Sequence, residues 1–223
     1  MNMVFNLKEF AIGCGLHDPE GFVAGVDKLY ELVIETNKTM NLTRIVEPEE
    51  FRIKHVADSL AIAREFPEFA SEYLKVADIG CGAGFPSLVL AMAFPNLKVT
   101  PIDSTGKKAA FVDRTAQALG LRNVNVVNGR SCELNRLSRF KHQFDVVTAR
   151  AVAPAPVIYG DADNFPKRKT GRFILYKTPE QAAEDLPALE IMCAKLPIKW
   201  HVTETFSLPE NAGKRLFLYS GEA

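Results

Sequence analysis

A glycine-rich turn between an apolar run and a helical stretch most constrains the fold of this chain. The run Leu74–Ile79 is typical of a buried strand, the segment Gly80–Phe85 contains three glycines, and residues 87–94 have a helical pattern. Glycine permits a tight turn and lets a ligand approach bare backbone. This order predicts the first unit of a parallel α/β sheet that holds a ligand at the turn.

The chain after residue 70 continues the alternation of strands and helices. Further helices are predicted at 106–119 and 179–194. The predicted strands are 74–79, 97–102, 124–127, 144–148, 172–176, 199–206 and 215–219. Such alternation is typical of a parallel sheet with right-handed crossovers. Because no helix separates the last two strands, we expect them to pair as an antiparallel hairpin.

Residues 1–70, here called the leader, have a helical pattern throughout. Phe22, Val26, Leu29 and Val33 share one face of a helix. A second helix is expected to begin at Glu47–Glu50, which contains a proline, and to end before Pro67. We therefore predict two domains: an N-terminal helical cap at 1–70 and a Rossmann-like domain at 71–223.

Composition narrows the class of protein. The chain has 27 basic and 27 acidic residues and is 47% hydrophobic, which favours a folded protein over disorder or a strongly basic nucleic-acid binder. No apolar run approaches the ~20 residues of a membrane span. The start does not resemble a signal peptide, so a cytoplasmic protein is expected. The four cysteines are far apart and lack the spacing of a metal site, so no metal is expected.

Two acidic residues give the turn its chemistry. Asp78 ends the first strand directly before the glycines, and Asp103, followed by Ser104, ends the next strand, where a carboxylate can accept the ribose hydroxyls of an adenosine. A turn containing Ser131 and Cys132 follows the third strand and is expected beside the adenine ring. This pattern favours S-adenosylmethionine as the cofactor.

Two other interpretations of the turn stay open. In the NAD pattern the third glycine lies one residue after Gly84, where this chain has Phe85. The turn of an α/β protein that binds nothing is the other alternative.

Three segments resemble one known family: D-I-G-C-G-A-G-F-P at 78–86, I-D-S-T-G-K-K at 102–108 and F-D-V-V-T-A-R-A-V-A-P at 144–154. They are similar to the glucose-inhibited division protein B family of bacterial 16S rRNA guanine-N7 methyltransferases. The leader segments N-L-T-R-I at 41–45 and H-V-A-D-S-L at 55–60 are also similar. The resemblance implies a seven-stranded Rossmann-like S-adenosylmethionine-dependent methyltransferase fold with an N-terminal helical cap. It implies methyl transfer to N7 of one guanine in the decoding region of 16S rRNA.

The resemblance also implies roles for single residues. Those expected to line the cofactor pocket, shape it or hold the ribose are Asp78, Gly80, Gly82, Gly84, Phe85, Asp103, Ser131, Cys132 and Arg150. The chain departs from the family at Cys81, Ser87 and Thr178, and Tyr159–Asp163 interrupts a stretch where a helix is expected.

The expected chemistry needs positioning more than proton transfer, because guanine N7 has a lone pair and no proton. Arg150, which only donates hydrogen bonds, is expected to bridge the cofactor and the target base. His55 and Asp58 share a helix face. They are either a catalytic polar cluster over the pocket mouth or a hydrogen-bonded pair that fixes the leader.

Basic residues are expected to hold the RNA. Lys107, Lys108 and the run Lys167, Arg168 and Lys169 are expected to contact phosphates from one rim of the sheet, and Lys177 is also assigned to the substrate. The expected partner is 16S rRNA or the small ribosomal subunit, bound by a monomer. The alternatives are a methyltransferase for a small molecule or protein, and a non-catalytic domain that binds a nucleotide or RNA.

Overall fold

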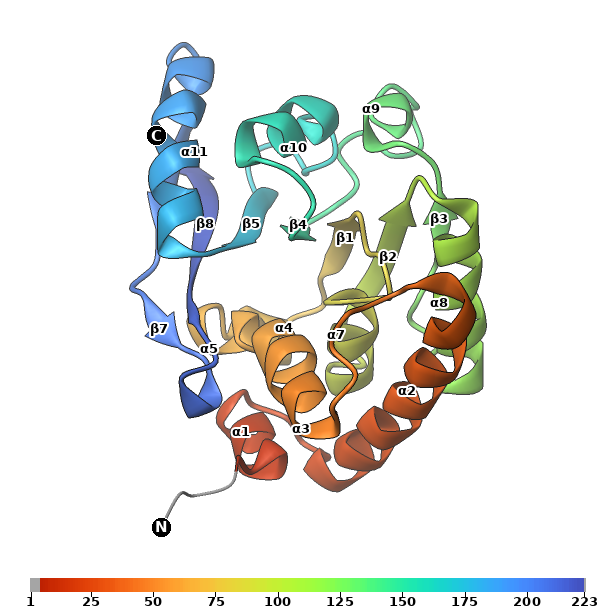
Figure 1. Ribbon diagram of the computed structural model, residues 1–223. Helices are drawn as coiled ribbons and strands as arrows, with labels where there is room; N and C mark the ends of the chain where they lie inside the picture. Colours follow the sequence, from red (N-terminus) through yellow and green to blue (C-terminus); the bar gives the residue numbers. More distant parts are fainter. Residues whose placement is uncertain (1–4, 223) are drawn as a thin grey trace.

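The computed structural model describes residues 5–222, which form one mixed sheet covered by helices on both faces (Figure 1). The strands are β1 (Lys75–Ile79), β2 (Lys98–Asp103), β3 (Val127–Asn128), β4 (Val146–Arg150), β5 (Arg172–Lys177), β6 (Ile198–Val202), β7 (Phe206–Ser207) and β8 (Lys214–Glu222). The order is β3-β2-β1-β4-β5-β8-β6, with β7 paired to β8 alone. The first five strands are parallel, and β8 runs antiparallel to its neighbours.

This topology confirms the Rossmann-like fold and the antiparallel hairpin at the end of the chain. The sheet has eight strands where seven were expected. The additional strand arises because the expected strand 199–206 is divided into β6 and the two-residue β7. Thr203, between them, still pairs with Phe217 of β8 through its backbone N–H and its hydroxyl oxygen.

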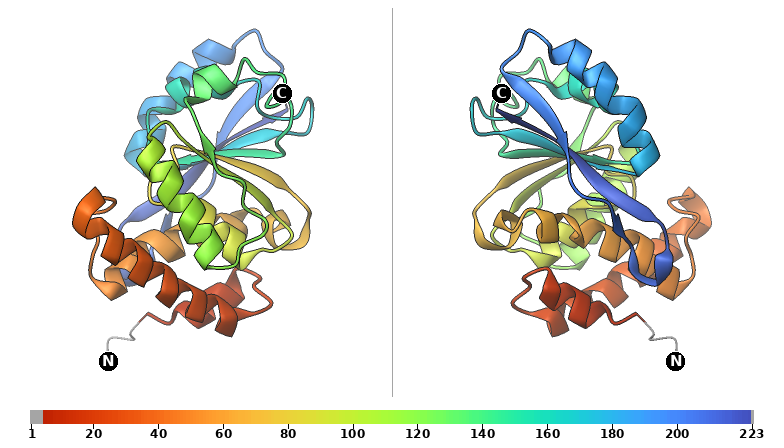
Figure 2. Two further views of the ribbon diagram at one scale, coloured as in Figure 1. Left: turned by 90° about the vertical axis from the view of Figure 1, so that its right-hand side faces the viewer. Right: turned by 90° about the vertical axis from the view of Figure 1, so that its left-hand side faces the viewer.

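Helices cover the two faces of the sheet in the way that right-handed crossovers require. One face carries α7 (Ser87–Ala93) and α8 (Gly106–Ala118), together with the leader. The other carries α9 (Ser131–Leu134), α10 (Ala155–Ala162) and α11 (Pro179–Cys193). The short 3₁₀ helix η2 (Pro209–Asn211) lies between β7 and β8. The side views show both layers against the twisted sheet (Figure 2).

The leader is helical, as expected. Its elements are α1 (Leu7–Gly13), α2 (Pro19–Met40), α3 (Pro48–Phe51), the π-helix η1 (Arg52–Ala57), α4 (Asp58–Leu60), α5 (Ile62–Glu65) and α6 (Glu68–Ser71). Asp18 caps α2 by accepting the N–H of Gly21 at 2.9 Å. The expected apolar face of α2 is buried. The π-helical turn within the second leader helix was not expected.

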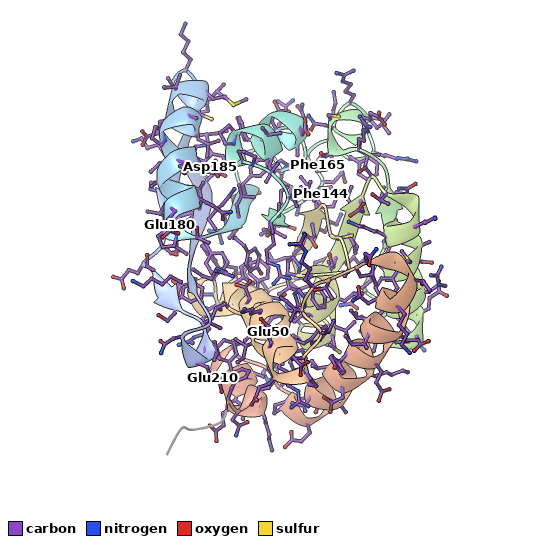
Figure 3. All side chains as sticks on the ribbon, in the orientation of Figure 1. Glu50, Phe144, Phe165, Glu180, Asp185 and Glu210 are labelled. Atoms are coloured by element: carbon purple, nitrogen blue, oxygen red, sulfur yellow. The ribbon has the colours of Figure 1, made fainter. Side chains whose placement is uncertain are left out.

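The side chains fill two cores, one on each side of the sheet (Figure 3). Along β1, Val76 points into the core that contains the leader, and Ala77 points into the core beneath α10 and α11. Phe51 and Leu60 of the leader belong to the same core as Leu88 of α7. Burial of these apolar faces fixes the leader against the sheet.

The interruption expected at Tyr159–Asp163 is wrong, because α10 continues to Ala162. Ile158, Tyr159 and Ala162 are buried against the sheet, and this packing outweighs the low helix propensity of Gly160. Among residues 5–222, none of the helices has the length and apolar character that a bilayer span needs.

Candidate functional site

A cavity of about 660 Å³ opens where β1, β2 and β4 end at their carboxyl termini. Its volume is in the range of sites for small ligands, and its place is where ligands bind in open α/β sheets. The residues assigned from the sequence that line it are His55, Gly80, Gly82, Phe85, Asp103, Ser104, Lys108, Ser131, Cys132 and Arg150. Asp78, at the end of β1, and Gly84, within the turn, are not among the lining residues.

The glycine turn presents backbone to the cavity. The N–H groups of Gly80 and Cys81 both donate to the carbonyl of Ile102, at 2.8 and 3.0 Å, and tie β1 to β2. Gly80 has φ 69°, and a Cβ there would meet the Val152 side chain at 2.5 Å. A side chain here would be strained by the left-handed backbone and would have to displace Val152, so glycine is strongly favoured.

Asp103 fits the ribose of an adenosine. Its Oδ2 accepts the N–H of Gly82 at 3.0 Å, and its Oδ1 accepts the N–H of Thr105 at 2.8 Å. These bonds fix the carboxylate at the cavity wall. Because each carboxylate oxygen has a second lone pair, the group can still accept ribose hydroxyls.

Asp78 supports the turn from below and is 1% exposed. Its Oδ2 accepts the N–H and the hydroxyl of Ser87. Burial raises the pKa of Asp78 to about 7, against the lowering effects of the Ser87 hydrogen bond and the nearby Arg150 charge. Within the described residues its Oδ1 has no hydrogen-bond partner. A buried acidic group with an unused oxygen fits a cofactor that brings positive charge to the turn.

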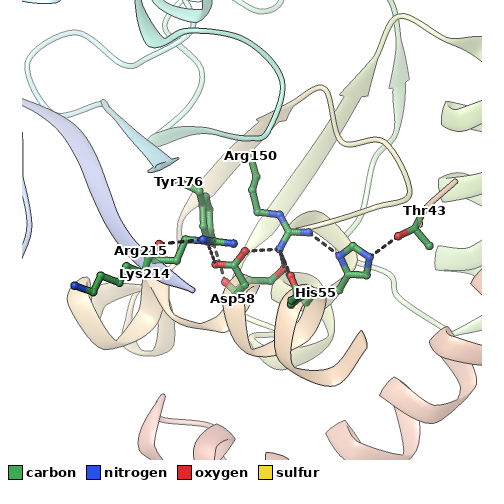
Figure 4. A network of polar contacts seen from close by, with 9 residues as sticks. Thr43, His55, Asp58, Arg150, Tyr176, Lys214 and Arg215 are labelled. Carbon is green, nitrogen blue, oxygen red and sulfur yellow. Dashed lines mark hydrogen bonds and ion pairs between the residues drawn. The ribbon is translucent and has the colours of Figure 1, made fainter. Parts of the chain in front are cut away.

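Arg150, at the end of β4, is directed at the leader (Figure 4). Its Nη1 donates to the carbonyls of Lys54 and His55, both at 3.3 Å. These carbonyls belong to the π-helix η1, and π-helical turns are frequent at functional sites. The guanidinium also lies over the Phe85 ring, 5.6 Å from its centre. Arg150 therefore joins the sheet edge and the leader at this cavity, which we call the cofactor cavity because its lining includes most of the residues that the sequence assigns to the cofactor.

His55 is held as a neutral ring. Its Nδ1 accepts from Nη2 of Arg150 at 3.3 Å, and its Nε2 lies 2.8 Å from the Thr43 hydroxyl. The ring stacks on Phe85 with 4.4 Å between ring centres. Burial, helped by the Arg150 charge, lowers the pKa of His55 to about 3. Because Arg150 only donates, the Nε2 of this neutral ring carries the proton and donates it to Thr43.

Asp58 lies between two arginines and does not line the cavity. Its Oδ2 is 3.2 Å from Nη1 of Arg150, and its Oδ1 is 3.2 Å from Nε of Arg215 on β8. Asp58 is 3% exposed. No local pattern in the sequence marks Arg215, because it reaches Asp58 from 157 residues further along the chain.

Comparison with known proteins identifies the family. The sequence profile of GidB, the rRNA small subunit methyltransferase G, matches residues 23–211. A relative from Limosilactobacillus reuteri named ribosomal RNA small subunit methyltransferase G is 42% identical over 182 residues, covering 81% of this chain and 74% of the relative. The chain belongs to the rRNA small subunit methyltransferase G family.

Solved structures agree on the fold of this family member. An O-methyltransferase from Bacillus cereus has a TM-score of 0.59 at 15% identity, covering 88% of this chain and 91% of that one. A SAM-dependent O-methyltransferase from Thermotoga maritima has a TM-score of 0.56 at 22% identity, covering 86% and 71%. At these identities the likeness establishes the Rossmann-like methyltransferase fold alone.

The basic residues fall at two opposite edges of the sheet. Lys107 and Lys108 follow β2, and Lys108 lines the cofactor cavity. The run Lys167–Lys169 precedes β5 and lines a different cavity of about 750 Å³ at the amino-terminal edge. The expectation that these groups share one rim of the sheet is therefore wrong, because one group follows its parallel strand and the other precedes its own.

Further lining residues were not assigned from the sequence. Arg130 lines the cavity directly before Ser131, so its position in that loop was a usable signal. Asp161 reaches the same cavity from α10. Lys177, which the sequence assigns to the substrate, lines a second, smaller cavity beside the first. Within residues 5–222, no group of three or more histidine, cysteine, aspartate or glutamate side chains is arranged to hold a metal ion.

Proposed function

We propose that this chain transfers the methyl group of S-adenosylmethionine to N7 of a guanine in 16S rRNA. Membership of the rRNA small subunit methyltransferase G family supports the substrate class. The observation that carries the reaction type is that both ring nitrogens of His55, the histidine of the cavity, are already engaged in hydrogen bonds.

Guanine N7 attacks with a lone pair and releases no proton, so the reaction needs no general base. His55 has a pKa of about 3 and both ring nitrogens are engaged, which makes it a poor proton acceptor. Burial raises the pKa of the Cys81 thiol, so this residue is not a thiolate nucleophile. A cavity with these properties suits a reaction in which alignment and exclusion of water supply the catalysis.

The residues of the cavity fit defined roles. Asp103 accepts from the ribose, and the turn Gly80–Phe85 admits the cofactor against backbone. Ser104, Ser131 and Cys132 lie beside the adenine. When bound, S-adenosylmethionine supplies an electrophilic methyl group on a sulfonium. Arg150 and His55 hold the leader over the cavity, and Asp58 positions Arg150 from outside it.

The cavity mouth carries positive charge for the RNA backbone. Lys107, Lys108 and Arg130 lie at or beside the cavity, at the same carboxyl edge of the sheet at which we expect the target base to bind. Cations placed there neutralise phosphates and orient the RNA. The partner is 16S rRNA, free or in the small ribosomal subunit, and we expect the enzyme to act as a monomer in the cytoplasm.

The deciding experiment uses labelled S-adenosylmethionine and small ribosomal subunits from a strain that lacks this protein. The RNA is digested after the reaction and its nucleosides are separated. Label in 7-methylguanosine at a single site is the expected result. Cofactor binding with no label in RNA would move the function to a small-molecule or protein substrate.

A further inference from the structure

We propose that the second cavity, beside the cofactor cavity, receives the ring of the target guanine, and that Glu184 reads its N1–H and N2 amino groups. This inference rests on the proposed function. The second cavity has a volume of about 350 Å³ and lies where β4 and β5 end. Its lining includes Pro154, Ile158, Tyr176, Lys177 and Glu184.

The two cavities are neighbours. Ala151 and Val152 line both of them, so a ligand in one lies next to a ligand in the other. Ala151 has φ 56°, a left-handed conformation that is uncommon outside glycine and concentrates at functional sites. Val152 is 45% exposed, although its methyl groups pack against Gly80. An exposed apolar side chain at this position offers a contact surface to a planar base.

A buried ion pair fixes the frame of the second cavity. Nζ of Lys177 lies 2.7 Å from Oδ2 of Asp185, and their side chains are 6% and 9% exposed. The same Asp185 oxygen accepts the N–H of Ala155 at 3.0 Å, and Lys177 also donates to the carbonyl of Ala153 at 3.1 Å. These bonds hold the segment 151–155 against β5 and α11, the helix on which Asp185 is labelled in Figure 3.

The hydrogen-bonding groups of Lys177 and Glu184 that residues 5–222 leave without a partner match the donors and acceptors of guanine. An ammonium has three N–H groups, and two of those of Lys177 are engaged, so one can donate to O6. Glu184 is exposed on α11, and in the described part of the chain no hydrogen bond or ion pair holds its carboxylate. A carboxylate accepts from N1–H and from the N2 amino group. Adenine offers the reverse pattern at these positions, with an acceptor at N1 and a donor at C6.

The placement also leaves N7 free to react. α11 contributes no residue to the lining of the cofactor cavity, so Glu184 meets the ring from the side away from Ala151 and Val152. The Watson–Crick edge then lies on α11 and the N7 edge lies toward the cofactor. Reading the Watson–Crick edge of an unstacked base is a common way for enzymes to select it.

The test compares two small-subunit RNA substrates, one with guanosine and one with inosine at the methylated position. Inosine lacks the N2 amino group. The proteins are the wild type, Glu184→Ala and the control Glu190→Ala, which changes an exposed glutamate of the same helix outside the cavity. For Glu184→Ala we expect kcat/KM on guanine to fall about 10- to 100-fold, the loss of a hydrogen bond to a charged group. The preference for guanine over inosine should largely vanish, and cofactor affinity should be unchanged.

The outcomes separate the two proposals. If the wild type labels guanine N7 but Glu184→Ala keeps the wild-type preference for guanine over inosine, the guanine pocket is rejected and the proposed function stands. The pocket is also rejected if Glu190→Ala loses as much activity as Glu184→Ala. If the wild type labels neither base, the proposed function itself fails and the pocket falls with it.

Discussion

Asp58 and Arg150, 92 residues apart in the chain, form a buried ion pair with 3.2 Å between Oδ2 and Nη1. Arg215 of β8 pairs with the other oxygen of the same carboxylate. One side chain of the leader therefore holds the ends of two separate strands beside the cofactor cavity. This arrangement makes Asp58 a structural and positioning residue, since it does not line the cavity.

Replacing Asp58 should cost stability. For Asp58→Ala we expect the free energy of unfolding to fall by about 3–5 kcal/mol, because a buried ion pair loses one partner. The matched control is Asp27→Ala, whose pair with Arg52 has side chains 52% and 43% exposed. That control should lose at most about 1 kcal/mol. Urea denaturation measures both, and equal losses would show that the Asp58 network does not hold the leader.

Local patterns predicted much of the site. The turn Gly80–Phe85, Asp103 and the pair Ser131–Cys132 all follow strand ends in one sheet, and their meeting at one edge follows from parallel topology. The direction of the Arg150 side chain did not follow. It depends on Asp58 and Arg215, which the fold brings together from the two ends of the chain.

Other features of the structure also differ from the sequence-based predictions, because they depend on the three-dimensional arrangement of the chain. Periodicity cannot reveal the π-helix η1, because the apolar face of the second leader helix continues through it. Charge alone does not locate the basic run Lys167–Lys169; its position before β5 puts it at the amino-terminal edge of the parallel strands. Arg130 could have been predicted, because it directly precedes Ser131 and Cys132 in the loop that the sequence assigns to the cofactor.

Cofactor affinity should depend on pH through Asp78. The folded-state pKa of about 7 lies above the ordinary value of 3.8, so ionisation of Asp78 disfavours the folded protein without cofactor. That contribution to stability is complete below the ordinary value and is lost as pH rises through about 7. A cofactor with net positive charge favours the ionised form. We therefore expect its affinity to increase with pH.

Calorimetry with S-adenosylmethionine tests this dependence. Between about pH 6 and about pH 8 the wild-type affinity should rise by at most about tenfold, which is the change in the ionised fraction of a group titrating at pH 7. In Asp78→Asn the side chain cannot ionise, so the part of the rise in affinity that is due to Asp78 should be absent. Any pH dependence that remains in this variant comes from titration of the cofactor or of other groups. Parallel pH profiles for the two proteins would rule out Asp78 as the titrating group.

Two glycines of the turn should respond differently to alanine. Gly82 has φ 56°, and an added Cβ would meet only the Gly80 carbonyl oxygen, at 3.9 Å. Gly82→Ala should cost about 1–2 kcal/mol of stability for the left-handed backbone. Because Gly82 lines the cavity, the added methyl group should compete with the cofactor for space, and cofactor affinity should fall roughly 10- to 100-fold.

Gly80→Ala should instead act on the fold, since the added Cβ lies 2.5 Å from the Val152 side chain. We expect a larger loss of stability than for Gly82→Ala, measured by thermal unfolding without cofactor. A Gly82→Ala protein that binds S-adenosylmethionine as tightly as the wild type would contradict the placement of the cofactor against this turn.

The two basic groups provide a matched test of where the RNA lies. Reversing the charges of Lys107 and Lys108, at the cofactor edge, should raise KM for the RNA substrate. It should also make RNA binding less sensitive to salt. The slope of log binding constant against log salt concentration should become shallower by about one unit for each phosphate that the protein no longer neutralises.

Arg168 and Lys169, at the opposite edge, are the control, chosen to leave the Lys167–Asp145 ion pair intact. Their reversal changes the net charge equally but not the cavity mouth. If that control weakens RNA binding as much, the substrate must extend around the sheet to its far edge, and the RNA-binding surface is larger than the cavity mouth.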